Sequence, residues 1–213
     1  MGDEARIHPI LYAISSLVLR PLFRTVYRLR RGGGHNVPAT GPVLFVSNHV
    51  SGMDPPLLGA GALPRRLHFM AKKELFAHPV ASWIISRVGA FPVDRGAADR
   101  NAIRVAKAVL NRGDALLMFP EGTRSDDGQL GPAWPGAGSL ALDDGVRVVP
   151  MAIWGSQHRF GPVRIEVGPP LDLTDLTEGS RAARARVAAD RMMVAIAELL
   201  ERAGGPAQRG SDD

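Results

Sequence analysis

A histidine and an aspartate five positions apart, His49 and Asp54, are the residues of this sequence whose side chains could act together chemically. On a regular helix, residues five apart point roughly 140° away from each other, so this pair can meet only in a non-helical turn. Ser51 and Gly52 supply flexibility for one. The carboxylate would hold one imidazole nitrogen and leave the other as a general base for a substrate hydroxyl. The pair therefore predicts activation of an alcohol.

The elements around the pair must bring it to the end of a strand. Residues 43–46 are apolar and predict a short buried strand, and the Asp-Pro-Pro sequence at 54–56 predicts the start of a helix. A purely structural interpretation of the two residues is also possible. In that reading Asp54 is an ordinary helix N-cap, and His49 is a polar residue satisfied at a strand end.

A second buried strand, predicted at residues 115–119, ends in a polar loop at 120–125. With this loop, four blocks of the chain resemble the glycerolipid acyltransferases, in particular the 1-acylglycerol-3-phosphate acyltransferases, in the order of that family. The blocks are Asn48-His49-Val50-Ser51-Gly52-Met53-Asp54, Gly89-Ala90-Phe91-Pro92-Val93-Asp94-Arg95, Phe119-Pro120-Glu121-Gly122-Thr123-Arg124-Ser125 and Val149-Pro150-Met151-Ala152-Ile153. Residues 72–76 are also similar to the family. The similarity extends over residues 43–168, and its first and third blocks are far less degenerate than a lone glycine motif.

The resemblance implies a fold and an activity. The fold would be a single α/β domain of the glycerol-phosphate acyltransferase type, with a central mostly parallel or mixed sheet flanked by helices. The activity would be transfer of a fatty acyl group from acyl-CoA or acyl carrier protein to the free hydroxyl of 1-acylglycerol-3-phosphate, in phospholipid biosynthesis. No metal or cofactor beyond the thioester co-substrate is expected. The alternatives are another lysophospholipid or glycolipid acceptor, or a non-catalytic lipid-binding protein on the same fold.

The resemblance also assigns residues to the binding of the acceptor. In the family, the arginine matching Arg95 contributes to binding glycerol phosphate, and a planar guanidinium grips phosphate oxygens well. The third block contributes Glu121, Gly122, Thr123 and Arg124 to the same site. Glu121 would orient a hydroxyl, hold a basic residue, or simply fix the loop. The base role goes to His49, because a carboxyl group ordinarily titrates near pH 4 and a histidine near neutrality.

The chain departs from the family pattern downstream of the third block. Many members place one or two lysines before a Gly-Ala pair there, whereas this chain has Ala133-Trp134-Pro135-Gly136-Ala137. A cation that would contact phosphate is missing, which leaves the headgroup of the acceptor open. Lys72 and Lys73, directly after a predicted strand, are possible phosphate contacts, and a solvated helix start is the alternative.

Composition sets the remaining bounds. The 213 residues, 45% of them hydrophobic, suffice for one domain with a real core. A formal net charge of +5 favours an anionic partner. The chain has no cysteine, which excludes disulfides, thiolate zinc sites and cysteine nucleophiles. No nucleic-acid partner is expected, since no recognised motif for one occurs.

Residues 136–141 match a G-x-G-x-x-A pattern but lack the preceding strand that a dinucleotide site requires.

The segment at residues 7–31 predicts a basic amphipathic helix. Its apolar core is too short to span a bilayer, which takes about 20 residues. On a helix, Arg20, Arg24, Arg28 and Arg31 fall on one stripe, and Ile14, Val18, Leu22 and Val26 on another nearly opposite. Such a helix would lie in the interface of an anionic membrane, placing the protein at the cytoplasmic face of the cell membrane as a peripheral or monotopic protein. The alternative is a helix packed on the domain with a solvated basic face.

These patterns divide the chain into three parts. Residues 1–34 would hold the basic helix and a glycine-rich linker, residues 35–203 the acyltransferase domain, and residues 204–213 a disordered tail. Within the domain, strands are predicted at 43–46, 67–70, 89–93, 115–119, 146–153 and 163–167. Helices are predicted at 55–63, 80–88, 98–111 and 181–202, the last with Ala188, Met192, Ile196 and Leu199 facing inward.

Overall fold

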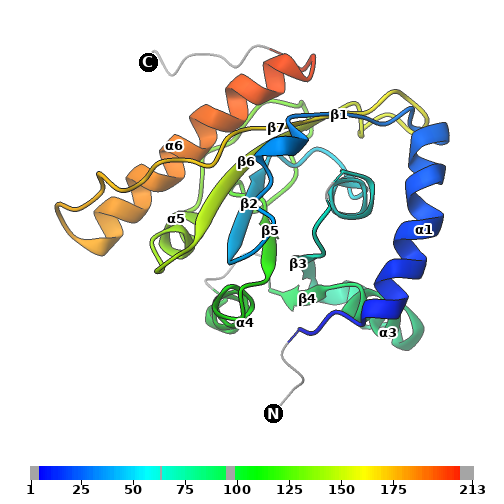
Figure 1. Ribbon diagram of the computed structural model, residues 1–213, viewed down its shortest axis with the longest axis horizontal. Coiled ribbons are helices and arrows are strands. Elements are labelled where there is room, and N and C mark those ends of the chain that lie inside the picture. Colours follow the sequence, from blue (N-terminus) through cyan, green and yellow to red (C-terminus); the bar gives the residue numbers. More distant parts are fainter. Residues whose placement is uncertain (1–4, 63, 95–98, 207–213) are drawn as a thin grey trace.

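A seven-stranded mixed sheet forms the centre of the computed structural model, which describes residues 5–62, 64–94 and 99–206 (Figure 1). The strand order is β1-β7-β6-β2-β5-β3-β4, and all neighbouring strands are parallel except β6 and β7. The strands are β1 (Arg30–Gly32), β2 (Val43–Ser47), β3 (Leu67–Lys72), β4 (Ala90–Val93), β5 (Ala115–Met118), β6 (Arg147–Trp154) and β7 (Arg164–Val167). The predicted α/β class with a mixed sheet is confirmed.

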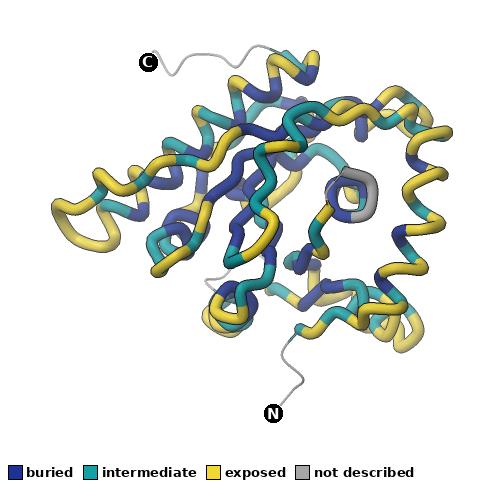
Figure 2. Tube along the Cα trace, viewed as in Figure 1, coloured by how far each residue is buried: buried dark blue, intermediate teal, exposed yellow. Residues whose placement is uncertain are grey.

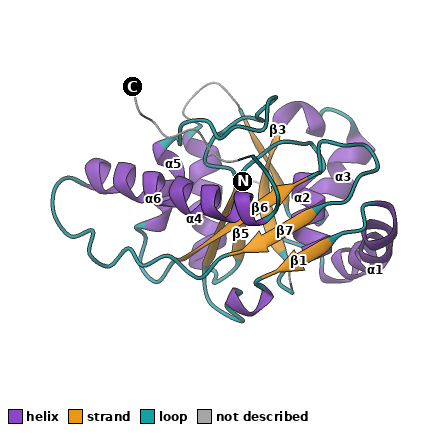
Figure 3. Cartoon of the chain, turned by 90° about the horizontal axis from the view of Figure 1, so that it is seen from above, coloured by secondary structure: helices purple, strands orange, loops and turns teal. Residues whose placement is uncertain are grey.

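Helices cover the sheet on both faces, as Figures 1 and 3 show. One side carries α1 (Pro9–Val26), α2 (Asp54–Pro56) and α3 (Pro79–Arg87), together with a π-helical segment η2 (Leu57–Ala62). The other side carries α4 (Arg100–Asn111), α5 (Pro135–Ala141) and α6 (Arg181–Arg202). Two short 3-10 helices, η1 (Gly34–Asn36) and η3 (Lys73–Phe76), complete the regular structure. Strands β6, β2, β5, β3 and β4 of this covered sheet all point the same way, so their carboxyl ends lie together at one end of the sheet. Open α/β proteins usually have their binding sites there.

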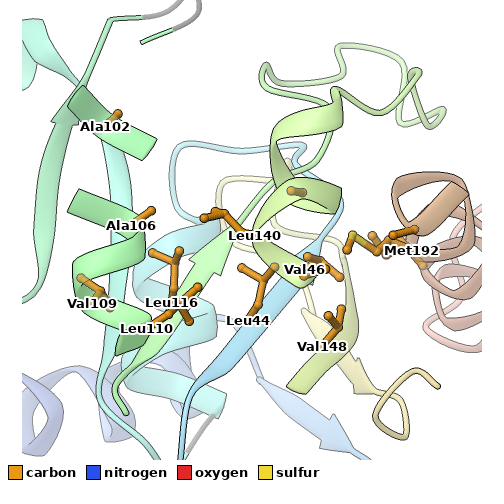
Figure 4. Packing of buried hydrophobic residues seen from close by; sticks show 14 of the residues in the cluster. Leu44, Val46, Ala102, Ala106, Val109, Leu110, Leu116, Leu140, Val148 and Met192 are labelled. Carbon is orange, nitrogen blue, oxygen red and sulfur yellow. The ribbon is translucent and has the colours of Figure 1, made fainter. Parts of the chain in front are cut away.

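Strand β2 is buried along its whole length because it packs on both helical layers. Val43 and Phe45 belong to the core cluster that also contains Leu57 and Leu58, under α1 and η2. The alternate residues of β2, Leu44 and Val46, belong to a second cluster with side chains from α4, α5 and α6 (Figure 4). The members of that cluster labelled in Figure 4 are Leu44, Val46, Ala102, Ala106, Val109, Leu110, Leu116, Leu140, Val148 and Met192.

The glycine-rich pattern at residues 136–141 serves packing. Gly138 lies in α5 where that helix crosses α6, and a Cβ atom at this position would stand 1.8 Å from the Ala185 carbonyl oxygen. No side chain fits in that space, so glycine is what allows the two helix backbones to approach. Gly136, two residues earlier, has no such constraint. The pattern thus reflects contact between helices, consistent with its failure as a dinucleotide motif.

The segment at 7–31 is not one helix, which corrects the prediction. Helix α1 ends at Val26, Arg28 adopts a positive φ of 42°, and the residues expected as the start of a linker form the edge strand β1. The turn has a structural cause. Backbone hydrogen bonds from Val163 N to the Tyr27 oxygen and from Arg30 N to the Val163 oxygen join this segment to the start of β7. Arg28 and Arg31 therefore lie outside the helical stripe in which they were expected.

Helix α1 rests on the domain through a narrow face and leaves the rest of its surface open, as Figure 2 shows. Tyr12, Ser16 and Phe23 are buried, and the Tyr12 hydroxyl accepts a hydrogen bond from Leu67 N at 3.3 Å. The apolar stripe predicted from the sequence is exposed: Ile14 by 53%, Val18 by 59% and Leu22 by 46%. Within the described residues, none of the helices has both the length and the apolar character required to span a membrane.

Candidate active site

Asp54 holds the turn that follows β2 by folding back onto it. Its Oδ2 accepts hydrogen bonds from Val50 N and Ser51 N, each at 2.8 Å, and lies 2.8 Å from His49 Nδ1. The predicted contact between the two side chains is therefore present, and it forms in a non-helical turn as the spacing required. Asp54 is the first residue of α2 rather than its N-cap, which is Met53. Its carboxylate accepts from residues that precede it, so the reading of Asp54 as an ordinary helix cap is wrong.

His49 is fixed on three sides. Its ring stacks on Phe119 with a centroid distance of 4.0 Å and an interplanar angle of 14°. Its backbone N–H donates to Glu121 Oε1 at 3.1 Å, and its carbonyl accepts from Ser125 N at 2.8 Å. With Nδ1 held at 2.8 Å from Asp54 Oδ2, where a carboxylate accepts a hydrogen bond from Nδ1–H, Nε2 is the ring nitrogen that remains for a substrate. His49 is buried among protein atoms but is one of the residues that line an open cavity.

Glu121 is buried, and its two oxygens are engaged with backbone. Oε1 accepts from His49 N at 3.1 Å, and Oε2 accepts from Gly131 N at 2.9 Å. Burial raises the pKa of this carboxyl group above its ordinary value, while the Gly131 and His49 N–H groups act in the opposite direction. The side chain ties the turn carrying His49 to the loop at 128–134. This geometry matches the loop-fixing role left open by the sequence, rather than the orientation of an acceptor hydroxyl.

A cavity of about 860 Å³ opens beside His49, on the side of the sheet that carries α4 and α5. Gly122 and Thr123, both predicted site residues, lie at its rim. Gly122 has a φ of 70°, and a Cβ there would press on the Trp134 ring at 3.2 Å. The wall is largely apolar, with its polar residues near His49 and at the start of α4. The apolar side chains that line it are Met70, Val93, Ala102, Ile103, Leu117, Met118, Phe119, Trp134 and Pro135.

Arg124 lies next to the catalytic turn but lines a different hollow. That hollow, of about 570 Å³, is formed by the loop at 121–134 and shares Glu121, Thr123 and Trp134 with the apolar cavity. A Cβ built on Gly52 would lie 3.7 Å from an Arg124 guanidinium nitrogen, so the arginine passes over the turn between His49 and Asp54. Within the described part of the chain, its guanidinium makes no hydrogen bond or ion pair. An exposed, unpaired cation beside the reacting groups is suited to an anionic substrate.

The other predicted cations lie farther from His49. Lys72 ends β3 with its Nζ 3.4 Å from Glu74 Oε1, and Lys73 is hydrogen-bonded to Asp94. Neither lysine lines either hollow. Arg20 and Arg24 are exposed on α1, and Arg28 follows that helix. Arg95, predicted to bind the acceptor phosphate, lies outside the described residues, as do residues 207–213 of the predicted tail.

Two polar residues at the site were not assigned a role from the sequence. Asn48 bridges to β6, donating from Nδ2 to the Ile153 oxygen and accepting at Oδ1 from Ile153 N, both at 2.9 Å. The Ser156 hydroxyl, in the loop after β6, donates to Asp54 Oδ1 at 2.5 Å. Asn48 stands in the first sequence block next to His49, which was a usable signal. Ser156 stands 102 positions from Asp54, and no local pattern connects the two.

The arrangement can remove a proton from a hydroxyl group. A histidine with one nitrogen held by a buried carboxylate and the other facing a cavity is the geometry of a general base. The apolar cavity beside it would hold a hydrocarbon, and Arg124 would hold an anion. Among the described residues, no three histidine, aspartate or glutamate side chains are grouped as they would be to hold a metal ion.

Comparison with known proteins gives concordant similarities. Residues 28–154 match the sequence pattern of the acyltransferase family. The chloroplastic 1-acyl-sn-glycerol-3-phosphate acyltransferase of Brassica napus is 32% identical over 152 residues, which cover 70% of this chain and 42% of that protein. The lyso-ornithine lipid O-acyltransferase of Pseudomonas aeruginosa is 42% identical over 114 residues, or 53% of this chain and 43% of that protein. The chain thus spans less than half the length of both relatives.

A solved structure has a similar fold. The crystal structure of the 1-acyl-sn-glycerophosphate acyltransferase from Thermotoga maritima superposes with a TM-score of 0.68 at 28% sequence identity. The superposition covers 89% of this chain and 79% of that one. The similarity therefore extends beyond the sequence blocks to most of the fold.

Proposed function

As this chain belongs to the acyltransferase family, we propose that it transfers a fatty acyl group from a coenzyme A or acyl-carrier-protein thioester to the free hydroxyl of 1-acylglycerol-3-phosphate. The observation that carries the proposal is the buried His49–Asp54 pair, with its free nitrogen beside a large apolar cavity. Relatives named as acyltransferases of that acceptor support it.

The reaction uses His49 as its base. Nε2 takes the proton of the acceptor hydroxyl while the hydroxyl oxygen attacks the thioester carbonyl carbon, and Asp54 stabilises the imidazolium that results. The tetrahedral intermediate then collapses, the carbon–sulfur bond breaks, and the thiolate leaves with the proton returned from His49. The products are a new ester and a free thiol. The reaction requires no covalent enzyme intermediate and no cofactor beyond the thioester co-substrate.

The hollows beside His49 divide the substrates between them. The apolar cavity suits an acyl chain, because its volume is about 860 Å³ and its walls offer aliphatic and aromatic contacts. The hollow with Arg124 would take the headgroup of the acceptor, with Arg124 as the cation of a lining that also contains Asp126 and Asp127. Arg124 and Arg95 would hold the phosphate, which brings the hydroxyl within attack distance of the thioester. Gly122 and Thr123 would shape the boundary between the two hollows.

The same proposal includes a membrane surface. Its acceptor is an amphipathic lipid, and α1 exposes both an apolar stripe and Arg20 and Arg24. An interfacial helix of this composition binds anionic membranes through buried apolar area and through attraction of its arginines to headgroups. We propose that the protein lies through α1 on the cytoplasmic face of the cell membrane; the exposed apolar stripe and arginines of α1 support the membrane contact.

A second acceptor has specific support. Ala133 and Trp134 stand where a family lysine would contact phosphate, and the Pseudomonas relative is named for a lyso-ornithine lipid, a different kind of acceptor. Trp134 lines both hollows, so it contributes to the walls on which an acceptor would rest. An acceptor other than a phosphate ester would not require the missing cation.

The experiment that tests the proposal measures thiol release from palmitoyl-CoA by purified protein in detergent. The acceptors compared are 1-acylglycerol-3-phosphate, glycerol 3-phosphate, lysophosphatidylcholine and lyso-ornithine lipid. We expect release that requires 1-acylglycerol-3-phosphate. Release only with lyso-ornithine lipid would retain the chemistry and replace the acceptor. No release with any acceptor, repeated with acyl-carrier-protein donors, would contradict the enzyme and favour a non-catalytic lipid-binding protein.

A further inference from the structure

We propose that Ser156 is a positioning residue for the acyl transfer. Its hydroxyl holds the Asp54 carboxylate, through Oδ1, in the orientation that keeps Oδ2 on His49 Nδ1. This inference rests on the proposed function, because it assigns Ser156 a part in that same reaction. Ser156 does not line the apolar cavity or the hollow with Arg124, so it acts through the dyad rather than on a substrate.

The hydrogen bonds around Asp54 are unevenly divided between its two oxygens. Oδ2 receives the Val50 and Ser51 backbone N–H groups and faces His49. Oδ1 receives Ser156 alone among the described residues, at 2.5 Å. The carboxylate is fully buried, where each oxygen of an ionised group requires a donor. Ser156 therefore supplies the fourth donor, and it opposes rotation of the carboxylate about its Cβ–Cγ bond.

The loop that carries Ser156 is fixed to the same strand end as His49. Strand β6 runs parallel to β2, with Met151 opposite Ser47, the last residue of β2, and it continues three residues further to Trp154 (Figure 1). The two hydrogen bonds between Asn48 and Ile153 join the residue after β2 to this extension of β6. Beyond them the chain turns at Gly155, which has a φ of 91°, and Gly155 N donates to Gln157 Oε1 at 3.0 Å. Ser156 is thus delivered to Asp54 by a tightly closed loop, and it is itself buried.

The position of the carboxylate matters most when the base becomes charged. While the acceptor hydroxyl attacks, His49 gains a proton, and the hydrogen bond from Nδ1 to Oδ2 becomes a contact between opposite charges. An Asp54 side chain that has lost its Oδ1 donor is free to turn away from that contact. Removing the Ser156 hydroxyl would therefore lower the rate of the chemical step and leave substrate binding unchanged, because no substrate-binding surface changes.

The experiment compares four variants of the full chain in the acyl-transfer assay. Ser156→Ala removes the hydroxyl, and Ser156→Cys keeps nearly the same volume but offers only a weak S–H donor. We expect kcat to fall about 10- to 100-fold in both, with KM for donor and acceptor within about twofold of wild type. Ser156→Thr, which retains the hydroxyl, should recover most of kcat. Arg159→Ala removes an exposed side chain of the same loop that lies over the Phe160 ring rather than near Asp54, and it should keep wild-type kcat.

A double-mutant cycle separates positioning from a structural role. In an Asp54→Ala background, Ser156→Ala should cause no further loss of activity, because its target is already absent. An equal loss with and without Asp54 would contradict the inference. So would wild-type kcat in both the Ala and Cys variants of an active enzyme. If the wild-type protein itself transfers no acyl group, the proposed function fails and this inference falls with it.

Discussion

At the scale of single residues, the site depends on carboxylates that accept backbone N–H groups. Asp54 closes the turn after β2 in this way, and Glu121 joins that turn to a loop from another part of the chain. These N–H groups, of which His49 N is buried and the others are partly buried, would otherwise lack these partners, and a buried donor without a partner costs about 1–3 kcal/mol. The position of the His49 ring is therefore set by backbone contacts as much as by its stacking on Phe119.

Replacing Glu121 tests this role. We expect Glu121→Ala to lower the free energy of unfolding by about 2–4 kcal/mol, because two backbone N–H groups lose their acceptors. Glu121→Gln keeps one acceptor oxygen and should lose about half as much. Denaturant unfolding followed by circular dichroism measures both values. Asp126→Ala removes an exposed carboxylate of the same loop and should leave stability unchanged. A Glu121→Ala variant as stable as wild type would contradict the proposal that Glu121 stabilises the fold by accepting these two N–H groups.

His68, which is buried in β3, makes stability depend on pH. Burial, only partly offset by Asp114 at 3.6 Å, lowers its pKa from 6.5 to about 4. The unfolded chain then binds more protons between these values, so stability should fall as the pH falls from 6.5 towards 4. The loss attributable to His68 is about 3 kcal/mol at its full extent. Unfolding midpoints of wild type and His68→Leu across this range measure the difference, and parallel pH profiles would contradict it.

At the scale of elements, the close contact between α5 and α6 supports the wall of the cavity. We expect Gly138→Ala to destabilise the protein by about 2 kcal/mol or more, because its Cβ would collide with the Ala185 carbonyl. Gly136→Ala in the same helix meets only side-chain atoms at 3.7 Å and beyond, and should be neutral or slightly stabilising. Thermal unfolding of the two variants is the measurement. Equal stability of the two would show that the helices can separate without cost.

The sequence predicted most elements because their apolar periodicity is strong. Residues 43–46 and 181–202 were found at or near their observed bounds, since a covered central strand and a long amphipathic helix leave clear patterns. Strand β1 was missed because two arginines and a glycine carry no such pattern, and only pairing with β7 makes them a strand. The contact between His49 and Asp54 was predictable from local spacing. The contact with Ser156 depends on the parallel pairing of β2 with β6, and spacing in the sequence cannot reveal that pairing.

At the scale of the whole molecule, the surface of α1 should decide membrane binding. Its apolar stripe is exposed although the domain has a complete core on both faces of the sheet, and Arg20 and Arg24 flank it. We expect Val18→Asp to lower binding to vesicles containing anionic lipid by about tenfold or more, because it replaces apolar surface that the membrane would cover with a charge that anionic lipid repels.

A matched control exists on the opposite side of the molecule. Val194 is 61% exposed on α6, which lies across the sheet from α1 (Figure 1). Val194→Asp introduces the same charge and should leave vesicle binding unchanged in a sedimentation assay. Binding should also weaken as salt rises, since the arginines act through screened attraction. Equal loss in the two variants would indicate a general effect of charge and contradict a membrane face at α1.

The role of His49 is tested most directly by measuring the diacyl product that wild type and His49→Ala form from palmitoyl-CoA and 1-acylglycerol-3-phosphate. Mass spectrometry quantifies this product. A control by circular dichroism establishes that the variant is folded. We predict that the variant loses about 100- to 10,000-fold in kcat, the range expected when a general base is removed. A folded His49→Ala protein that forms the product at the wild-type rate would contradict the assignment of His49 as the base.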